Sequence, residues 1–438
     1  MTTMLQSQQP ASAKTSLDDD KKCGCDSSDV CVSHCAAYGN VCPCHARAAA
    51  KAACKKISDL LYDSKLFPEG EPSFRKVNIS EIEMGERLGE GGFSMVASCT
   101  FKDSSLTPSQ PLAIKYLKRR IMVEKKCFEY GAADLANEAF FLGRLNHPNI
   151  ITLHAVTEGK VENNISTGKD ACFFIIVDQL VDTLDKRMER WQKDAKEQHH
   201  SLFYRLSREY KETQRLHLKE RVKVALDIAK IMKYLHSLDL VFRDLKPDNL
   251  GFAADGTLKL FDFGLCKELK KHNALDDGTY KMTGHTGSRR YMAPEVALDR
   301  PYNNTVDVYS FGILLWEMCA LEKPFAGFNC NRHMREVVIA GDRPKMDSAH
   351  TAHWPIDLQW IMNSSWSSDP ASRPSFETIV QTLQHVVEEL ESLKAARVRS
   401  RSEGNATESS QSSVGGKGSQ SPMRKGPRIL KIPGLISI

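Results

Sequence analysis

Long apolar runs, a signal-peptide core and a large excess of either charge are all missing from this sequence of 438 residues. The longest apolar run, Val306 to Leu321, contains Asp307 and Glu317, so it predicts a buried helix and no membrane span. The N-terminus has no apolar stretch, and the acidic run at 18–20 argues against an organellar presequence. These absences favour an intracellular protein, and we expect it in the cytoplasm, with the nucleus as the alternative.

The small net charge of +5 belongs to one end of the chain. Residues 395–438 hold eight Lys or Arg and two Asp or Glu, so the remaining residues are nearly neutral. No nucleic-acid partner is therefore expected for the folded part. The same segment is rich in Ser and Gly, which predicts a disordered basic tail, with a nuclear-import or acidic-partner patch as the less favoured interpretation.

The C-x-x-C spacing of zinc knuckles is also missing, although seven of the thirteen cysteines fall between Cys23 and Cys54. C-x-C pairs such as Cys42 and Cys44 can bind soft metals, so zinc is one hypothesis for this segment. A reduced, disordered tail is the favoured alternative, and lipidation is a third. The six cysteines outside the cluster are expected to be reduced and buried.

A strand-rich part followed by a helix-rich part predicts an α+β fold with two lobes. Strands are expected near 89–100, 111–116 and 171–180, and a helix near 137–145. The expected division is a disordered region at 1–79 with a cysteine-rich segment at 23–54, an N-terminal lobe at 80–178, a C-terminal lobe at 179–394 with a charged insertion at 186–217, and the tail at 395–438.

Glycines interrupt the first strand-like stretch, "LGEGGFSMV". Gly89 and Gly91 would let backbone N–H groups approach phosphate oxygens, because no Cβ stands in the way. A third glycine is missing, and Ser94 stands in its place. An ordinary glycine-rich hairpin is the alternative interpretation.

Four charged or polar positions follow at wide spacing. "LAIK" ends at Lys115, and the helical stretch "ANEAFFLGRL" contains Glu138, although a solvated strand end and an exposed helix carboxylate would look the same. "VFRDLKPDN" supplies Asp244, and "LKLFDFGLCK" supplies Asp262. A carboxylate directly after a buried strand needs a cation, and Mg²⁺ bridging phosphates meets that need.

These stretches, together with "TGSRRYMAPEV" and "DVYSFGILLWEM", resemble the eukaryotic protein kinase domain from about Ile82 to Leu393. They look most like the tyrosine-kinase-like serine/threonine group. The resemblance implies a small antiparallel β N-lobe with one main helix, a larger and mainly helical C-lobe, and ATP between them. It also implies protein substrates and Mg²⁺, with Mn²⁺ as an alternative.

The resemblance assigns roles to individual residues. Asp244 would be the catalytic base, Lys246 the cation near the transferred phosphoryl group, and Asn249 and Asp262 the metal ligands. The nucleotide would contact Leu88, Gly89, Glu90, Gly91, Gly92, Phe93, Ser94, Val96, Ala113, Lys115, Glu138, Asp178 and Leu180. Structural and regulatory roles would go to Val177 as gatekeeper, Asp307 beneath the catalytic loop, Glu295 and Arg373 as an ion pair, and Arg243, Thr283, Thr286 and Ser288 as regulatory residues.

Two residues depart from the family pattern. Phe242 stands where the loop motif has histidine, and Gly251 stands where a bulky aliphatic side chain usually lies beneath the adenine. Phe242 keeps the aromatic ring, and Lys246 and Ser288 are the serine/threonine form. We therefore predict a serine/threonine kinase active in intracellular signalling, with a pseudokinase scaffold as the alternative.

Overall fold

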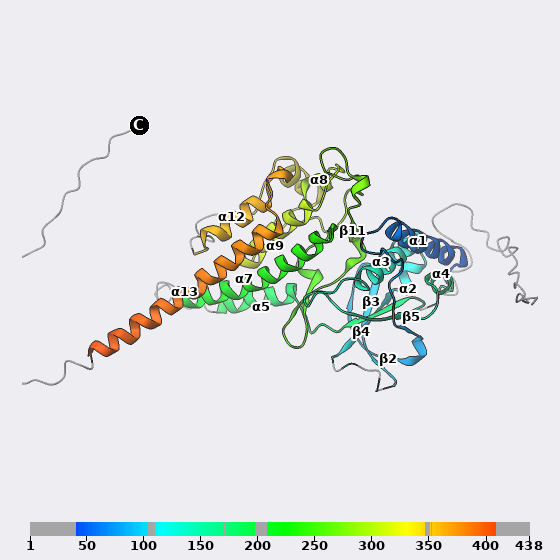
Figure 1. The fold of residues 1–438 in the computed structure, drawn as a ribbon, viewed down its shortest axis with the longest axis horizontal. Coiled ribbons are helices and arrows are strands. Elements are labelled where there is room, and N and C mark those ends of the chain that lie inside the picture. Colours follow the sequence, from blue (N-terminus) through cyan, green and yellow to red (C-terminus); the bar gives the residue numbers. More distant parts are fainter. Residues whose placement is uncertain are drawn as a thin grey trace, which may run out of the picture. The chain divides into compact units, whose positions relative to one another are not determined.

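The computed structural model of the chain describes residues 41–408, except 104, 106–107, 109, 170, 198–207, 347–350 and 352. The described residues up to Glu388 form one compact unit, and Glu389 begins a second, whose described residues continue a helix to Glu408. The first unit contains both predicted lobes, and the predicted α+β class is confirmed (Figure 1).

The N-lobe is built on a six-stranded sheet with the order β1-β5-β6-β4-β3-β2. Its strands are β1 (Lys76–Val77), β2 (Ile82–Glu90), β3 (Ser94–Phe101), β4 (Leu112–Leu117), β5 (Leu153–Thr157) and β6 (Phe174–Asp178). All neighbours pair antiparallel except β1 and β5, which are parallel. Ile114, Phe174 and Ile176 are completely buried in its core, as expected for apolar residues that alternate along strands.

One long helix and three short helical segments accompany the sheet. They are η3 (Ile79–Glu81), α2 (Arg119–Met122), α3 (Lys125–Leu142) and α4 (Val161–Ser166). The predicted helix at 137–145 overlaps the last part of α3, which begins earlier, at Lys125, and ends at Leu142, before the predicted end. Its N-terminal half was harder to predict because Gly131 lies within it.

The C-lobe is mainly helical. Its helices and helical turns are α5 (Leu184–Glu197), α7 (Arg208–Ser237), η5 (Pro247–Asn249), η6 (Phe263–Leu265), η7 (Lys271–Asn273), α8 (Pro294–Ala297), α9 (Thr305–Ala320), α10 (Cys330–His333), η8 (Met334–Ile339), α12 (Ile356–Ser365), η9 (Pro370–Ser372) and α13 (Phe376–Glu408). Its strands are short: β7 (Asp182–Thr183), β8 (Leu240–Val241), β9 (Leu250–Phe252), β10 (Leu258–Leu260) and β11 (Lys267–Glu268).

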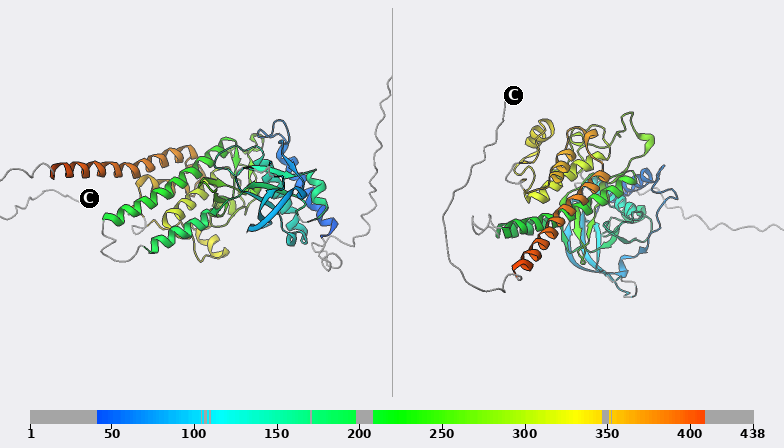
Figure 2. Two further views of the ribbon diagram at one scale, coloured as in Figure 1. Left: turned by 90° about the horizontal axis from the view of Figure 1, so that it is seen from below. Right: turned by 60° about the vertical axis from the view of Figure 1, so that its left-hand side comes forward.

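The predicted disorder of residues 1–79 is wrong for the described part of that region. Helix α1 (Pro43–Leu61) lies there and packs against α3 and α4 (Figures 1 and 2). Its alanines recur at helical spacing, and Ala46, Ala49 and Ala53 are at most 1% exposed. The sequence did not predict this helix, because alanine contributes little apolar area and its stripe gives a weak amphipathic pattern. Residues 1–40 lie outside the described residues.

Two other expected segments are helical where they are described. The charged insertion at 186–217 contributes to α5 and α7 where it is described, and 198–207 lie outside the described residues. The predicted disorder of 395–438 is wrong for 395–408, which continue α13, and the rest is not described.

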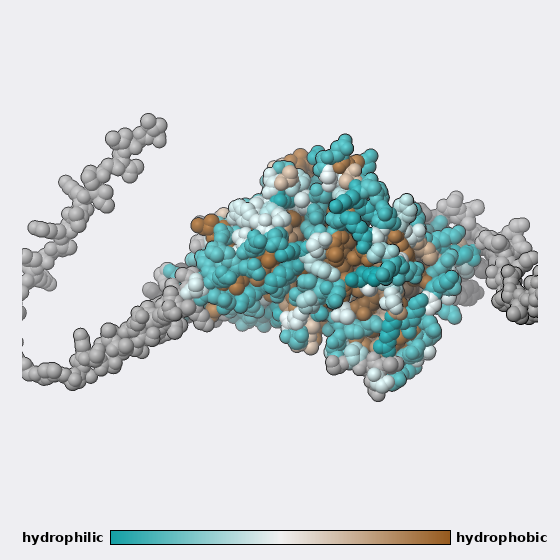
Figure 3. Space-filling view, viewed as in Figure 1, coloured by the Kyte–Doolittle hydropathy of each residue, from teal (hydrophilic) through white to brown (hydrophobic). Residues whose placement is uncertain are grey.

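Three expectations from the composition concern the surface, membrane spans and the cysteines. Hydrophilic residues cover most of the face in Figure 3, with hydrophobic patches near its middle. None of the described helices is long and apolar enough to cross a membrane. Of the six cysteines outside the cluster, only Cys99, Cys266 and Cys319 are buried, so the expected burial is wrong for the other three.

Candidate active site

Three charged residues meet between the sheet, α3 and η6. Lys115 on β4 donates from Nζ to Glu138 Oε2 at 2.5 Å and to Asp262 Oδ1 at 3.0 Å. Lys115 and Glu138 are largely buried, with 14% and 4% of their side chains exposed. The alternative interpretation of Lys115 as a solvated strand end and of Glu138 as an exposed carboxylate is therefore wrong.

The charges of this triad set one another's protonation. Burial disfavours the Lys115 cation, but Asp262 and Glu138 outweigh it and hold the pKa of Lys115 above its ordinary value. The Lys115 charge lowers the pKa of Asp262. Burial raises the pKa of Glu138. A cation and an anionic Asp262 side by side suit the binding of a phosphate–metal complex.

Asp244 lies at the centre of a hydrogen-bond network. Lys246 Nζ donates to Asp244 Oδ2 at 2.7 Å, and Asn249 Nδ2 donates to the same oxygen at 3.0 Å. The Ser288 N–H donates to Oδ1 at 2.8 Å, and Lys246 Nζ also donates to Ser288 Oγ at 2.8 Å. The Ser288 hydroxyl therefore contacts Lys246, while the backbone N–H of Ser288 contacts Asp244.

Gly287, which the sequence did not mark, lets the backbone before Ser288 lie close to Arg243 and Asp244. Gly287 has φ +92°, and a Cβ there would lie 2.3 Å from the Arg243 carbonyl oxygen. Only glycine fits both restraints. The sequence signal was the "TGSRR" stretch, in which the glycine directly precedes Ser288.

Asp307 holds the catalytic loop from beneath, as predicted. Its carboxylate is fully buried and accepts hydrogen bonds from the Phe242 N–H at 2.9 Å and the Arg243 N–H at 2.8 Å. The Phe242 ring packs edge-to-face on Phe263, with ring centroids 5.2 Å apart and 76° between the planes. Phe242 thus packs against the phenylalanine that follows Asp262.

The glycine-rich hairpin joins β2 and β3. The Gly91 N–H donates to the Ser94 carbonyl at 2.9 Å, which closes the turn without a third glycine. Lys118 donates from Nζ to the Gly91 carbonyl and lies 2.6 Å from Glu90. The remaining predicted members lie around this hairpin and strand: Leu88, Gly89 and Gly92 are on β2 and the turn, Phe93 and Val96 lead into and along β3, and Ala113 is buried on β4.

The connection between the lobes begins after Val177, which is 5% exposed. The Asp178 carboxylate accepts from the Thr152 N–H at 2.9 Å and lies 2.8 Å from His154 Nε2. These hydrogen bonds outweigh the effect of burial and lower the pKa of Asp178 to about 2.

The Gly251 departure has a steric explanation. A Cβ on Gly251 would lie 2.7 Å from Leu180 Cδ1, 2.9 Å from the Asp182 carbonyl oxygen and 3.3 Å from a Phe261 ring carbon. The space of the missing aliphatic side chain is therefore filled by Leu180 and Phe261. A larger residue at 251 would displace backbone.

Arg243 connects the catalytic loop to the segment 262–295. Its Nε donates to the Leu265 carbonyl at 2.7 Å, and Nη1 donates to Thr283 Oγ1 at 3.1 Å. Thr286 Oγ1 donates to Thr283 Oγ1 at 3.1 Å. The structure thus brings Arg243 to Thr283 and places Thr286 beside it.

Asn137 is a functional candidate that sequence reasoning missed. Its Nδ2 donates to the carbonyls of Phe263, Gly264 and Cys266 at 3.0–3.1 Å, and the side chain is 1% exposed. It therefore holds the turn after Asp262 against α3. No sequence pattern signals this role except its place directly before Glu138.

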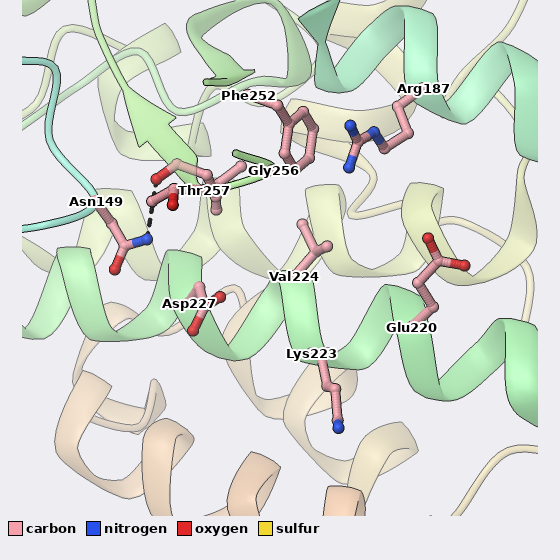
Figure 4. Close-up of a pocket in the computed structure, with 10 residues that line it drawn as sticks. Asn149, Arg187, Glu220, Lys223, Val224, Asp227, Phe252, Gly256 and Thr257 are labelled. Carbon is pink, nitrogen blue, oxygen red and sulfur yellow. Dashed lines mark hydrogen bonds between the residues drawn. The ribbon is translucent and has the colours of Figure 1, made fainter. Parts of the chain in front are cut away.

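A pocket of about 300 Å³ opens elsewhere in the C-lobe, between α7, Arg187 of α5 and the β9–β10 hairpin (Figure 4). The Arg187 guanidinium carbon lies 3.4 Å from the centre of the Phe252 ring, and Asn149 donates to the Leu258 carbonyl at 2.9 Å. None of the predicted site residues lines this pocket, so it is separate from the site around Asp244.

The matched family model is that of protein tyrosine and serine/threonine kinases, and it covers residues 82–383. A probable serine/threonine-protein kinase of Dictyostelium discoideum is 29% identical over 314 residues, which cover 71% of this chain and 28% of the relative. Serine/threonine-protein kinase VIK of Arabidopsis thaliana is 32% identical over 314 residues, 70% of this chain and 60% of the relative.

The alignment thus spans less than two thirds of either relative. The match to the family model includes every predicted catalytic, nucleotide-binding and metal-binding position, from Leu88 to Asp262. The chain belongs to the protein tyrosine and serine/threonine kinase family.

Proposed function

We propose that this chain is an active serine/threonine kinase that transfers the γ-phosphoryl group of ATP to protein hydroxyls. The observation that carries the proposal is the hydrogen-bonded Asp244, held by Lys246, Asn249 and Ser288. A scaffold that only binds partners has no need for this network. We expect a role in intracellular signalling, in the cytoplasm or the nucleus.

The residues divide the work of phosphoryl transfer. Asp244 accepts the proton of the acceptor hydroxyl and orients its oxygen toward the phosphoryl group. Lys246 lies 2.7 Å from Asp244 and offers its positive charge to the transferring group. Lys115 binds phosphate oxygens, and Glu138 fixes the Lys115 ammonium.

The donor set fits magnesium as the cofactor ion. Asp262 offers a carboxylate that Lys115 keeps ionised, and Asn249 uses its Nδ2 for Asp244, so its amide oxygen remains for a metal. Hard oxygen donors suit Mg²⁺, and Mn²⁺ is the alternative. Asn249 and Asp262 would hold the ion, which would supply positive charge to the phosphates.

A radioactive ATP transfer assay on a generic basic protein tests the proposal. The parent should label the substrate on serine and threonine, and Asp244→Asn, which keeps the shape of the side chain, should lower the rate by orders of magnitude. Phosphoamino-acid analysis identifies the acceptor class. Equal incorporation by parent and variant would refute the assignment and favour the scaffold.

We also propose that a phosphate on Thr283 or Thr286 raises activity. Arg243 already contacts Thr283 and has a positive φ of 72°, a conformation that needs support from its surroundings. A phosphate there would form a bidentate pair with the guanidinium and order the segment. Thr283 is exposed, which leaves it accessible to a kinase.

Phosphatase treatment tests this switch. Active enzyme should lose at least tenfold in rate after treatment, and the Thr283→Ala/Thr286→Ala variant should match the treated enzyme. Full activity in both samples would show that the segment is ordered without phosphate.

We further propose a soft-metal site at the start of α1. One ligand atom from each of Cys42, Cys44 and His45 lies within 4.8 Å of the others. His45 is 3% exposed, and its Nδ1 has no hydrogen-bond partner among the described residues. Two thiols and an imidazole suit zinc. The sulfurs are 2.7 Å apart, and binding would need to spread them by about 1 Å.

Metal analysis of the full-length protein decides between metal and free thiols. A site predicts about one zinc per chain, lost in Cys42→Ser/His45→Gln but retained in the control Cys330→Ser. Substoichiometric zinc in the parent would refute the site.

A further inference from the structure

Helix α1 lies before the residues matched by the family model, yet it packs against α3, the helix that carries Glu138. Four of its seven buried residues are alanines, and two of these, Ala49 and Ala53, are completely buried. Because these side chains end at Cβ, the two helices can lie close together. The position of α3, and with it the Lys115–Glu138 ion pair, therefore depends on a neighbour outside the matched domain.

The turn after α1 contacts the segment that follows Asp262. Ser64 Oγ donates to Glu268 Oε2 at 2.5 Å, and the Lys65 N–H donates to Glu268 Oε1 at 2.8 Å. Glu268 is 4% exposed and Ser64 is 8% exposed. In the part of the chain that the structure describes, the Glu268 carboxylate has no other hydrogen-bond donor, so the turn alone satisfies this buried charge.

Lys270 makes the reciprocal contact. Its Nζ donates to the Asp59 carbonyl at 2.9 Å, to the Leu60 carbonyl at 3.3 Å and to the Tyr62 carbonyl. The last carbonyls of a helix have no partner within it and form the negative end of its dipole, so a lysine there stabilises the end of α1. Two residues of the segment after Asp262 are thus tied to α1 and its turn.

Aromatic residues extend the contact along the C-terminal end of α3. The Phe67 ring centroid lies 6.2 Å from that of Phe140, and the Phe74 ring packs edge-to-face on Phe140 at 5.4 Å. Phe67 and Phe140 are at most 3% exposed. The chain from α1 to Phe74 therefore holds α3 at several points along its length.

We propose that helix α1 and the turn at 62–67 are a clamp built into this kinase, which positions α3 and the residues after Asp262 for catalysis. Glu268 is the positioning residue that joins the turn to the segment 262–295. The clamp deepens the proposed function and rests on it. It touches neither nucleotide nor substrate, and acts through Glu138 and Asp262.

Steady-state kinetics of the full-length protein test the clamp. Glu268→Ala should lower kcat at least tenfold and raise the KM for ATP, because Glu138 and Asp262 orient the nucleotide. The KM for a peptide substrate should stay within twofold. Glu268→Gln should restore kcat to within threefold of the parent, since its amide can still accept from the Lys65 N–H. Lys55→Ala, which removes an exposed ion pair with Asp59 on the same helix, is the matched control and should match the parent.

Hydrogen exchange gives an independent readout. Residues 125–142 should exchange faster in Glu268→Ala than in the parent, and Glu268→Gln should reverse the change. If Glu268→Ala fails to fold, Ser64→Ala removes one hydrogen bond, keeps the other, and should lower kcat about threefold. An active parent whose Glu268→Ala variant keeps kcat within twofold, or whose Glu268→Gln variant gives no rescue, would overturn the clamp alone. An inactive parent would instead overturn the proposed function.

Discussion

Truncation of Phe242 gives a sharp test of how the lobes are joined at the active site. The ring is 1% exposed and packs edge-to-face on Phe263, which directly follows Asp262. Phe242→Ala leaves a cavity, and such truncations cost about 3–5 kcal/mol of unfolding free energy. At about 2–4 °C per kcal/mol, the value for larger domains, the melting temperature should fall by roughly 6–20 °C.

Activity should fall for a related reason. Without Phe242, Phe263 loses an aromatic neighbour, and Asp262 is held less firmly in its left-handed conformation, with φ 69°. We expect kcat to drop at least tenfold, measured well below the melting temperature of the variant. Phe242→His is the matched control: it keeps an aromatic ring and the backbone N–H bonded to Asp307, so its rate should stay within a few-fold of the parent.

The comparison of the two variants decides the question. Thermal melts and phosphoryl transfer should both rank parent and Phe242→His together, with Phe242→Ala far below. If histidine and alanine do equal damage, the site requires something other than the packing of an aromatic ring, and the argument from the Phe242–Phe263 contact is wrong.

Three further predictions follow from buried charges. Lys115→Met should lower phosphoryl transfer by orders of magnitude, because it removes the cation between Glu138 and Asp262; an unchanged rate would refute this role. Arg373→Ala should lower the unfolding free energy by about 3–5 kcal/mol in denaturant titration, since it leaves Glu295 buried without its bidentate partner; a change below about 1 kcal/mol would refute it. Burial raises the pKa of Asp134 to about 7 from its ordinary 3.8, so the folded state binds the proton more tightly and stability falls as pH rises from about 4 to 7. Asp134→Asn should therefore raise the melting temperature at pH 8 and leave it nearly unchanged at pH 4; equal shifts at both would contradict the assignment.

Residues whose role depends on short spacing could be predicted from the sequence. Asp244, Lys246 and Asn249 lie within one loop, so their order fixes their approximate geometry, and the structure brings all three together. Lys115 and Glu138 lie farther apart, but a strand and a helix in a familiar order place them as partners. The ion pair of Glu295 and Arg373 was also predicted, and it is present.

Contacts of residues that no family motif marks could not be predicted. Asn137 reads as an ordinary helical residue until the carbonyls after Asp262 are seen against it. The alanine stripe of α1 has low hydrophobicity, and its burial becomes evident only when α3 is placed beside it. Gly251 appears from the sequence to leave a gap. The structure shows that Leu180 and Phe261 fill this space, and neither is next to Gly251 in the sequence.

Residues marked by a motif and residues placed only by the fold come together at the segment after Asp262. Its chemistry is local, since Asp262 is fixed by its motif, but its conformation is held from outside by Asn137 and by Ser64 through Glu268. A left-handed φ at Asp262 is unfavourable for a non-glycine residue, by about 1–3 kcal/mol, and persists only where neighbours impose it. On the proposed function the motif specifies which group meets phosphate and metal, and on the proposed clamp α3 and the turn after α1 determine how often that group is in place. On this argument, substitutions on the buried face of α1 should change the catalytic rate without changing which residues react, whereas the exposed Lys55→Ala should leave the rate unchanged.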